Sequence, residues 1–450
     1  MKALIKLFKK ILYERNFLSF VGNLGFSFFG FISFIILTRT LSKEDFGLFT
    51  IFLTASAFID LFRFGLTRTA LVRFTSGVKD KDSIPWLGAN SIIGLALAII
   101  ISLVLLLIVL LFPNAIASSD FRYFFYFYPI LVFTNLFWNN GLSVLQSWQA
   151  FGRIFIVRMA NVVSFVLFLI VDLIWLDWGL IAIIWANIGS NLLASIITLY
   201  FGWDGTRFTF KYEKEKVLQM LHYGKYSMGT MLGSSLLKSA DTFLIGLAPF
   251  LGAVGVAKYV IPLKLTELLE IPLRSFMATA FPKMAKFSLN NELGKWKETF
   301  YSYGGVISLL FIPFIISLFI FAEPIVLLLG GEQYRDSLGE LTLIFRVFTI
   351  YGLILPLDRI SGVALDSLNA PKSNLIKVVF MASVNIVGDL VAIYVFDSLF
   401  YVALVTVLNT IIGLIMGYYY LNKIVKIDFM QFVVMGNKFF VDLINRRVLK

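Results

Sequence analysis

The stretch LTRTLSKEDFGLF, residues 37–49, places four charged side chains between two long apolar runs. The charged residues are Arg39, Lys43, Glu44 and Asp45. The preceding run begins at Phe17, and the following run extends from Phe46 to Leu66. At about 1.5 Å rise per residue, each run is long enough to cross a hydrocarbon layer of roughly 30 Å as a helix. The stretch is therefore predicted to be a tight turn between two membrane spans.

The composition of the whole chain agrees with a membrane protein. Hydrophobic residues make up 59% of the 450 residues and charged residues only 15%, and the mean hydropathy is +0.87. A soluble domain of this length needs far fewer apolar residues to fill its core. Runs of spanning length lie at residues 17–36, 46–66, 86–112, 123–145, 155–176, 178–201, 223–250, 254–281, 300–321, 338–357, 375–395 and 399–421. None shows the short alternating pattern of an outer-membrane barrel, so we predict an all-α polytopic bundle of twelve transmembrane helices.

The formal charge of +12 is unevenly distributed along the chain. If the N-terminus is cytoplasmic, the outward links hold only five of the 39 Lys and Arg residues, namely Arg39, Lys43, Arg122, Lys258 and Arg335. This asymmetry across short loops is the positive-inside signature, so both termini are predicted to be cytoplasmic. The same distribution argues against a nucleic-acid partner. With no cysteine and a single histidine, no metal site and no disulfide framework are expected.

A polar segment in the middle of the chain divides the spans into two sets of six. Residues 202–216, GWDGTRFTFKYEKEK, follow the sixth span and are predicted to form a cytoplasmic linker. The expected domains are an N-terminal six-helix lobe (1–202), a C-terminal six-helix lobe (217–422) and a cytoplasmic amphipathic tail (423–450). The tail is predicted to lie as a helix on the anionic inner leaflet, and the alternative is a disordered tail.

Ionisable groups inside spans indicate where function resides, because each costs several kcal/mol unless it meets water or a partner. In the eighth span, Lys264, Glu267, Glu270 and Arg274 recur at intervals that place them on one helical face. One interpretation is a stripe lining a water-filled cavity. The other is that Lys264 pairs with Glu267, and Glu270 with Arg274.

Other intramembrane charges leave similar alternatives open. Lys238 and Asp241 are three residues apart in the seventh span and can pair locally. Asp60 and Arg63 lie near the cytoplasmic end of the second span, where interfacial anchoring is the simpler interpretation. Arg346 has no acidic residue three or four positions away, so an anionic ligand or a backbone carbonyl must satisfy it.

The opening stretch resembles the first outward turn of bacterial Wzx-type polysaccharide flippases, which belong to the multidrug/oligosaccharidyl-lipid/polysaccharide exporter superfamily. Further stretches resemble the same family in the same order along almost the whole chain. These are FGLTRTALVRF, ADTFLIGLAPFLGAVGVAKYV, FPKMAK, IVLLLGGEQY and LNAPKSNLIKVVFMASVNIVGDL. The resemblance implies two lobes around a central cavity and the bacterial cytoplasmic (inner) membrane as location.

The resemblance also implies a function. Such a flippase moves an undecaprenyl-pyrophosphate-linked oligosaccharide from the inner to the outer leaflet by alternating access, for surface polysaccharides such as the O-antigen of lipopolysaccharide. It is not an enzyme and needs no cofactor beyond a coupling ion, H⁺ or Na⁺. Its expected partners are the lipid-linked oligosaccharide, membrane lipids and a polysaccharide polymerase, and the monomer is expected to be functional.

Under this interpretation, each charged residue has an expected role. The residues expected to bind substrate are Arg274, Arg346, Lys264, Lys238 and Arg63. The residues expected to take part in coupling or ion pairing are Asp241, Glu267, Glu270 and Asp60. Arg39 is expected at an outer gate. The first span lacks the arginines of relatives that flip the peptidoglycan precursor, which argues against that cargo.

Two other functions remain open at this point. A cation-coupled multidrug exporter of the same superfamily could use Asp241, Glu267 and Glu270 as its ion site. Glycan polymerases or ligases need a large outward loop carrying catalytic residues. Every outward link here is short, and none combines a nucleophile with a base and an orienting group.

Overall fold

The computed structural model describes residues 15–75 and 80–448. Within these ranges, the side chains of residues 15–24, 80, 226–227, 230, 234, 237–238, 278 and 443–448 lie outside the description. The described residues are helical throughout, apart from short connections.

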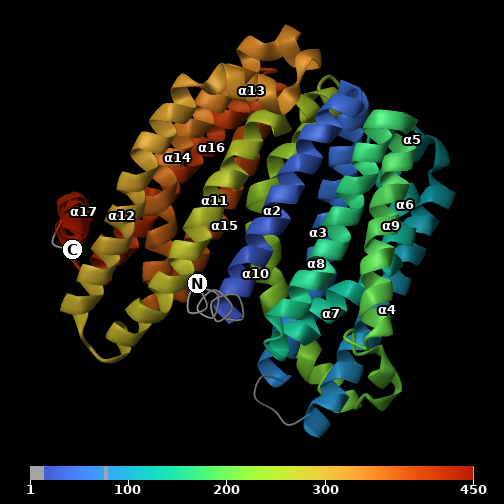
Figure 1. Ribbon diagram of the computed structural model, residues 1–450, viewed down its shortest axis with the longest axis horizontal. Coiled ribbons are helices and arrows are strands. Elements are labelled where there is room, and N and C mark those ends of the chain that lie inside the picture. Colours follow the sequence, from blue (N-terminus) through green and yellow to red (C-terminus); the bar gives the residue numbers. More distant parts are fainter. Residues whose placement is uncertain (1–14, 76–79, 449–450) are drawn as a thin grey trace, which may run out of the picture. The chain divides into compact units, whose positions relative to one another are not determined.

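The helices follow one another along the chain with few breaks (Figure 1). In the first half they are α2 (Arg15–Thr40), α3 (Lys43–Thr75), α4 (Asp80–Leu111), α5 (Pro113–Ala117), α6 (Arg122–Thr134), α7 (Leu136–Ser147), α8 (Phe151–Val171), η1 (Asp172–Leu176), α9 (Gly179–Tyr200) and η2 (Thr206–Lys211). From the middle onward they are α10 (Lys214–Leu247), α11 (Gly252–Leu289), α12 (Leu293–Ile320), α13 (Ala322–Gly330), η3 (Glu332–Ser337), α14 (Leu338–Ser367), α15 (Pro371–Tyr394), α16 (Leu399–Ile424) and α17 (Met430–Val448).

These helices account for the predicted membrane spans. Within the described residues, eight helical segments are long and apolar enough to cross a membrane. The remaining predicted spans correspond to α2, the α6–α7 pair, α10 and α11. The prediction of an all-α polytopic membrane protein with twelve transmembrane segments is therefore confirmed.

The chain divides into two compact units, residues 1–235 and 236–450, and the division lies inside α10. The predicted linker at 202–216 forms η2 and the start of α10. In the first unit η2 packs against α4, and a Cβ atom at Gly88 would lie 2.9 Å from the backbone nitrogen of Tyr212. This close approach seats the polar segment on the end of α4.

The opening turn of the first unit is a helix cap. The Ser42 hydroxyl accepts the backbone N–H of Asp45 at 3.1 Å and donates to the Asp45 carboxylate at 2.9 Å, which caps the first turn of α3. Arg39 is exposed at the end of α2, where its guanidinium donates to the backbone carbonyl of Ile35 at 2.8 Å. A cation at the C-terminal end of a helix also interacts favourably with the helix dipole.

The fourth span is broken between α6 and α7. The Ser195 hydroxyl of α9 lies at this break: it donates to the carbonyl oxygen of Thr134 at 2.5 Å and accepts the backbone N–H of Trp138 at 3.1 Å. A side chain inserted between residue i and residue i+4 in this way is a common cause of helix kinks. The break is therefore held open by a neighbouring helix.

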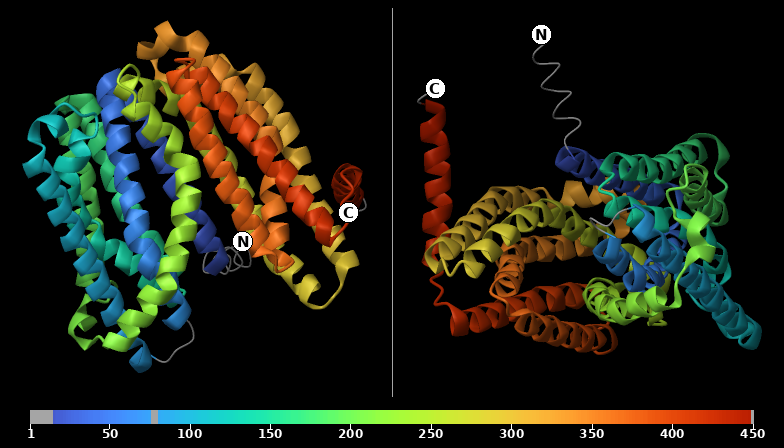
Figure 2. Two further views of the ribbon diagram at one scale, coloured as in Figure 1. Left: turned by 180° about the vertical axis from the view of Figure 1, so that it is seen from behind. Right: turned by 90° about the horizontal axis from the view of Figure 1, so that it is seen from below.

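In the second unit α14 is the central helix, packed against α11, α12 and α16 (Figures 1 and 2). Gly352 permits part of this packing, because a Cβ atom there would lie 2.7 Å from Leu269 Cδ1 and 2.6 Å from Ile315 Cδ1. Helix α15 packs mainly against α16. The four long helices α11, α14, α15 and α16 carry most of the side chains described in the next subsection.

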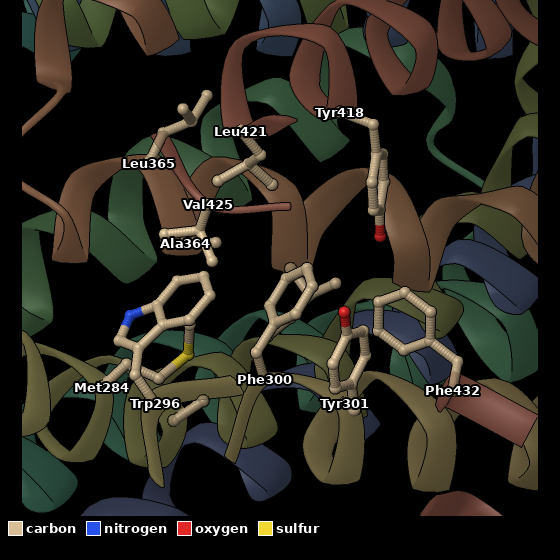
Figure 3. Packing of buried hydrophobic residues seen from close by; sticks show 12 residues of the cluster. Met284, Trp296, Phe300, Tyr301, Ala364, Leu365, Tyr418, Leu421, Val425 and Phe432 are labelled. Atoms are coloured by element: carbon tan, nitrogen blue, oxygen red, sulfur yellow. The ribbon is translucent and has the colours of Figure 1, made fainter. Parts of the chain in front are cut away.

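A cluster of large apolar side chains joins one end of this bundle to α17 (Figure 3). Phe432 of α17 lies edge-on to Phe300 and Tyr301 of α12, with ring centroids 5.1 Å apart in both pairs. Trp296, a member of the same cluster, is fully buried, and its indole N–H donates to the Ser367 hydroxyl at 2.9 Å. Helix α17 is thus anchored to the unit by its first turn.

Candidate functional site

The charged stripe predicted in the eighth span lies along α11. The Nζ atom of Lys264 is 2.5 Å from the Glu267 carboxylate, and the Arg274 guanidinium is 2.6 Å from that of Glu270. Both predicted local pairs are therefore present. α11 continues as one helix through Pro262, Pro272 and Pro282.

A second arginine, Arg359 of α14, approaches the Glu270 carboxylate from the other side. It donates to Oε1 at 2.9 Å, while Arg274 donates to Oε2 at 2.6 Å. Two cations around one anion leave a net positive charge. The side chain of Glu270 is largely buried, but those of Arg274 and Arg359 are 72% and 43% exposed. We call these three residues the arginine pair with its Glu270 counterion.

This arrangement can bind a second anion. Each guanidinium carries five N–H donors in a planar fork, so a bond to Glu270 leaves capacity for phosphate or carboxylate oxygens. Because charge exposed on a transmembrane helix requires water or a partner, the exposed guanidinium groups indicate a solvated or ligand-binding face.

The sequence-based prediction missed Arg359. The predicted tenth span ends at residue 357, whereas α14 continues to Ser367. The structural reason is that α14 continues through Pro356, and no further proline occurs until Pro371, which follows the positive φ (+57°) of Asn369. The lack of a proline between residues 357 and 370 is the signal that could have placed Arg359 inside the helix.

A buried ion pair lies beside Arg359, between α14 and α15. The Lys377 ammonium is 2.5 Å from the Asp358 carboxylate and donates to the Ser361 hydroxyl at 3.0 Å. Gly413 and Gly417 of α16 provide the room: a Cβ atom at Gly417 would lie 3.4 Å from Lys377 Nζ, and one at Gly413 would lie 3.0 Å from Asp358 Oδ1. Since both charges are buried and mutually paired, this pair has a structural role.

A separate cluster of oxygen atoms joins four helices of the second unit. Its two carboxylates, Asp241 of α10 and Asp389 of α15, are buried. Both accept from the same amide nitrogen, Asn385 Nδ2, at 2.9 Å and 2.8 Å. The hydroxyls of Tyr259 and Thr406 donate to Asp241 Oδ2 at 2.5 Å and 3.3 Å. We call this group, with Asn409 of α16, the oxygen cluster.

The oxygen cluster has the chemistry of a cation site. The hydrogen-bonding partners described for both carboxylates are neutral. Oδ1 of Asp389 and Oδ1 of Asn409 are buried, and neither has a hydrogen-bonding partner among the described residues. Two carboxylates that share one donor cannot both stay ionised in a dry interior without a compensating positive charge. A proton or a small monovalent cation such as Na⁺ would supply that charge. Among the described residues, no group of three or more His, Cys, Asp or Glu side chains could hold a metal ion.

Among the members of the oxygen cluster, the sequence-based prediction assigned a coupling or ion-pairing role to Asp241 alone. Asn385, Thr406 and Asn409 are uncharged, and Asp241 is 144 residues from Asn385. The signal available in the sequence was the spacing of Asn385 and Asp389, one turn apart in an apolar helix, which places both on one face.

In the first unit, Asp60 and Arg63 form an ion pair at 3.1 Å, but it lies within a packed network. Asp60 accepts from Tyr128 at 2.8 Å and from Asn135 at 2.7 Å. Arg63 is fully buried and donates to Asn135 Oδ1 and, at 2.7 Å, to the Val132 carbonyl. The network ties α3 to the break between α6 and α7.

The remaining predicted residues lie elsewhere. The guanidinium of Arg346 is half-buried over the ring of Phe319, 5.3 Å from its centroid. Its Nε atom has no hydrogen-bonding partner among the described residues. The side chain of Lys238 lies outside the described residues, so its predicted pairing with Asp241 is not described.

The sequence of this chain matches a known protein family. The family described as polysaccharide biosynthesis protein matches residues 36–338. A comparison with the curated proteins found no match.

Solved structures with the same fold are transporters of the MOP superfamily. One is a multidrug resistance MATE family transporter in an inward-facing conformation, 15% identical, with a TM-score of 0.75 over 92% of this chain and 96% of the other. Another is the lipid II flippase MurJ in an inward closed conformation, 15% identical, with a TM-score of 0.68 over 95% and 93%. A third is a MOP superfamily transporter from Pyrococcus furiosus, 15% identical, with a TM-score of 0.64 over 92% and 94%. The family match covers more than half of the chain, and the protein therefore belongs to the polysaccharide biosynthesis protein family, with the fold of the MOP superfamily.

Proposed function

We propose that this protein is a flippase that moves an undecaprenyl-pyrophosphate-linked oligosaccharide from the inner to the outer leaflet by alternating access. The cargo would serve assembly of a surface polysaccharide such as O-antigen. The observation that carries the proposal is the arginine pair with its Glu270 counterion. Membership of the polysaccharide biosynthesis family supports a glycan cargo.

The chemistry of the cargo matches the arginine pair. A pyrophosphate presents several anionic oxygens, and guanidinium groups bind such oxygens through paired, charge-assisted hydrogen bonds. Glu270 keeps Arg274 and Arg359 compensated when no cargo is bound. An arriving pyrophosphate competes with Glu270 for the same N–H donors, so binding and release exchange one anion for another. Such an exchange lowers the free-energy cost of releasing the cargo. A transporter must release its cargo as well as bind it.

The oxygen cluster would supply the coupling step. A proton or Na⁺ bound between Asp241 and Asp389 would hold α10, α15 and α16 together, and its loss would leave two unscreened carboxylates that favour separation of these helices. Coupling requires that the cation bind two conformations with different affinities. The cluster provides the binding half of this requirement.

The same proposal includes the cellular location, oligomeric state and partner of the protein. The protein would reside in the bacterial cytoplasmic membrane with both termini inside, work as a monomer, and hand its cargo to a polysaccharide polymerase. Glu270 and Arg274 lie close to the midpoint of α11, and the Leu289 end of this helix is predicted to be cytoplasmic. Cargo would reach the site from that side.

A deletion strain tests the proposal. Loss of the gene should leave lipid-linked oligosaccharide accumulating in the inner leaflet while its synthesis continues, and the wild-type gene should restore surface polysaccharide. Arg359→Ala should fail to restore it at equal protein level, whereas Arg335→Ala, in an exposed pair with Glu332, should restore it. Normal surface polysaccharide in a deletion strain with no second flippase would reject the proposal.

The alternative is a cation-coupled multidrug exporter of the same superfamily. The oxygen cluster favours it, since a buried cation site serves any coupled transporter, and one structural neighbour is named a multidrug resistance transporter. An exporter predicts drug sensitivity in the deletion strain with surface polysaccharide unchanged. The same strain therefore separates the two functions.

A further inference from the structure

Helix α17 crosses α12 where the polar part of α12 gives way to its apolar part. Residues 293–303 of α12 include Lys295, Lys297 and Glu298, and residues 304–321 carry no charge. The crossing lies at Gly304 and Gly305, where an added Cβ atom would collide with Phe432 of α17. The crossing therefore lies at the depth of a membrane–water interface, on the side where α12 begins.

Helix α17 runs across the other helices of its unit instead of along them. In Figure 1 it is seen nearly end-on, while α12 and α14 lie along the plane of the picture, and Figure 2 shows it extending away from α12. Since α12 spans the membrane, a helix that crosses it in this way at the interface lies along the membrane surface. Its length of 19 residues is available for contact with lipid.

The face of α17 turned away from α12 is largely apolar, with the exposed Asn437 as a polar member. Met430, Val434 and Val441 lie within a narrow arc of the helix and are 69%, 52% and 54% exposed. Phe432 and Gly436 on the opposite side are buried against α12. A helix with one protein-packed face and one exposed apolar face at interfacial depth is suited to insertion among lipid acyl chains.

Cationic side chains gather beside this apolar face. A cavity of about 550 Å³ lies at the junction of α12 and α17, and its lining includes Lys297, Lys426 and Gln431. It also contains Glu298 and Asp428, but the Asp428 carboxylate accepts the backbone N–H of Met430 at 3.0 Å and so caps α17. The chain from residue 423 onward holds six basic residues and two acidic ones. These are Lys423, Lys426, Lys438, Arg446, Arg447 and Lys450, with Asp428 and Asp442.

We infer that α17 is an interfacial helix that binds anionic phospholipid of the inner leaflet. Met430, Val434 and Val441 contact the acyl chains, and Lys297 and Lys426 bind the phosphate group of a lipid at the α12–α17 junction. The charge of the tail selects anionic over zwitterionic lipid, because cationic residues close to the surface are attracted to an anionic leaflet.

Single cysteines test the apolar contact, since the natural chain contains none. A spin label at Val434→Cys, in full-length protein in bilayers containing phosphatidylglycerol, should collide with lipid-soluble oxygen more often than with a water-soluble nickel chelate. A label at Asp442→Cys, an exposed position outside the apolar arc, should show the reverse order. Equal exposure of both labels to the nickel chelate would overturn the lipid contact. If both labels are shielded from oxygen and from the nickel chelate because the protein forms a dimer, the apolar face contacts a second copy of the chain. That result would also overturn the lipid contact.

The headgroup site is tested by lipid retention. Native mass spectrometry of the full-length protein should show several-fold more bound phosphatidylglycerol than phosphatidylcholine. The variant Lys297→Gln with Lys426→Gln should lose that preference. The matched variant Lys286→Gln with Lys372→Gln removes two exposed lysines outside the cavity and should keep it. Equal loss in both variants would show a general charge effect and reject the site. Neither measurement depends on transport, so a failed flippase assay leaves the inference intact.

Discussion

Arg359 of α14 and Glu270 of α11 are 89 residues apart in sequence and form a hydrogen bond of 2.9 Å. Arg274 donates to the other oxygen of the same carboxylate. Glu270 therefore pairs with an arginine of its own helix and with an arginine of α14. The carboxylate has one negative charge for two guanidinium groups, so the group as a whole is positively charged.

Removing the counterion should strengthen binding of a pyrophosphate, and removing an arginine should weaken it. Arg359→Ala should reduce affinity for undecaprenyl pyrophosphate roughly tenfold to a hundredfold, since a hydrogen bond to a charged group contributes about 1.5–3 kcal/mol. Arg359→Lys should retain part of it. Glu270→Gln should bind more tightly than wild type yet transport more slowly, because nothing then competes with the cargo. Binding to purified protein checks the affinities, with Arg335→Ala as control. Weaker binding by Glu270→Gln would contradict the competition between Glu270 and cargo.

The role of Arg274 can be separated from that of its partner. If Arg274 only neutralises Glu270, Arg274→Ala should transport as well as wild type, because Arg359 still pairs with the Glu270 carboxylate. We expect instead that Arg274→Ala is impaired, since one of two pyrophosphate ligands is missing. Transport in proteoliposomes decides between these results.

The oxygen cluster predicts a stability that depends on cations. If Na⁺ is the coupling ion, NaCl should raise the Tm of the purified protein above its value in choline chloride at equal ionic strength, because a cation that binds only the folded state stabilises it. Asp389→Asn should abolish this difference. Asn409→Asp, which adds a carboxylate to the cluster, should enlarge it. If the coupling ion is a proton, Na⁺ should have no effect in any variant, and acidification should raise the Tm of the wild type more than that of Asp389→Asn.

Gly417 of α16 predicts a steric effect of substitution on stability. An Ala at Gly417 would place its Cβ atom 2.4 Å from the Ser361 hydroxyl oxygen and close to the buried Lys377 ammonium, so either the ion pair or the helix must shift. Such overpacking typically costs about 1–3 kcal/mol, and the Tm should fall by several degrees. Gly339→Ala is the matched control, since no atom lies within 4 Å of its added Cβ. Equal Tm values for both variants would show that α16 is loosely packed here.

The membrane orientation can be checked with cysteines as well. Glu44→Cys, in the first turn of α3, should react with an impermeant maleimide added to intact cells. Arg207→Cys, an exposed position in η2, should react only after the membrane is opened. Reaction of Arg207→Cys in sealed cells would invert the predicted topology of the first unit.

The sequence predicted the helices and the local pairs but not the contacts that assemble them. Apolar runs, charge asymmetry and residue spacing depend only on the local sequence of each segment. For this reason the spans and the Lys264–Glu267 pair could be predicted. The oxygen cluster depends on neutral side chains such as Asn385 and Thr406, whose partners are far away in sequence. Arg359 was missed for a different reason: hydropathy marks where the apolar run ends, whereas α14 continues through Pro356 and ends only at Ser367.

Arg63 and Ser195 make the shape of the fourth span a property encoded in other helices. The bend between α6 and α7 depends on a hydroxyl from α9 and is tied to α3 by the Arg63 guanidinium. A chimaera that takes residues 122–147 from a relative would therefore inherit the sequence of that span without its bend. To transfer the bend, the chimaera must also take the residues at positions 63 and 195 from the relative. Comparisons between relatives should therefore consider residues 122–147 together with α3 and α9.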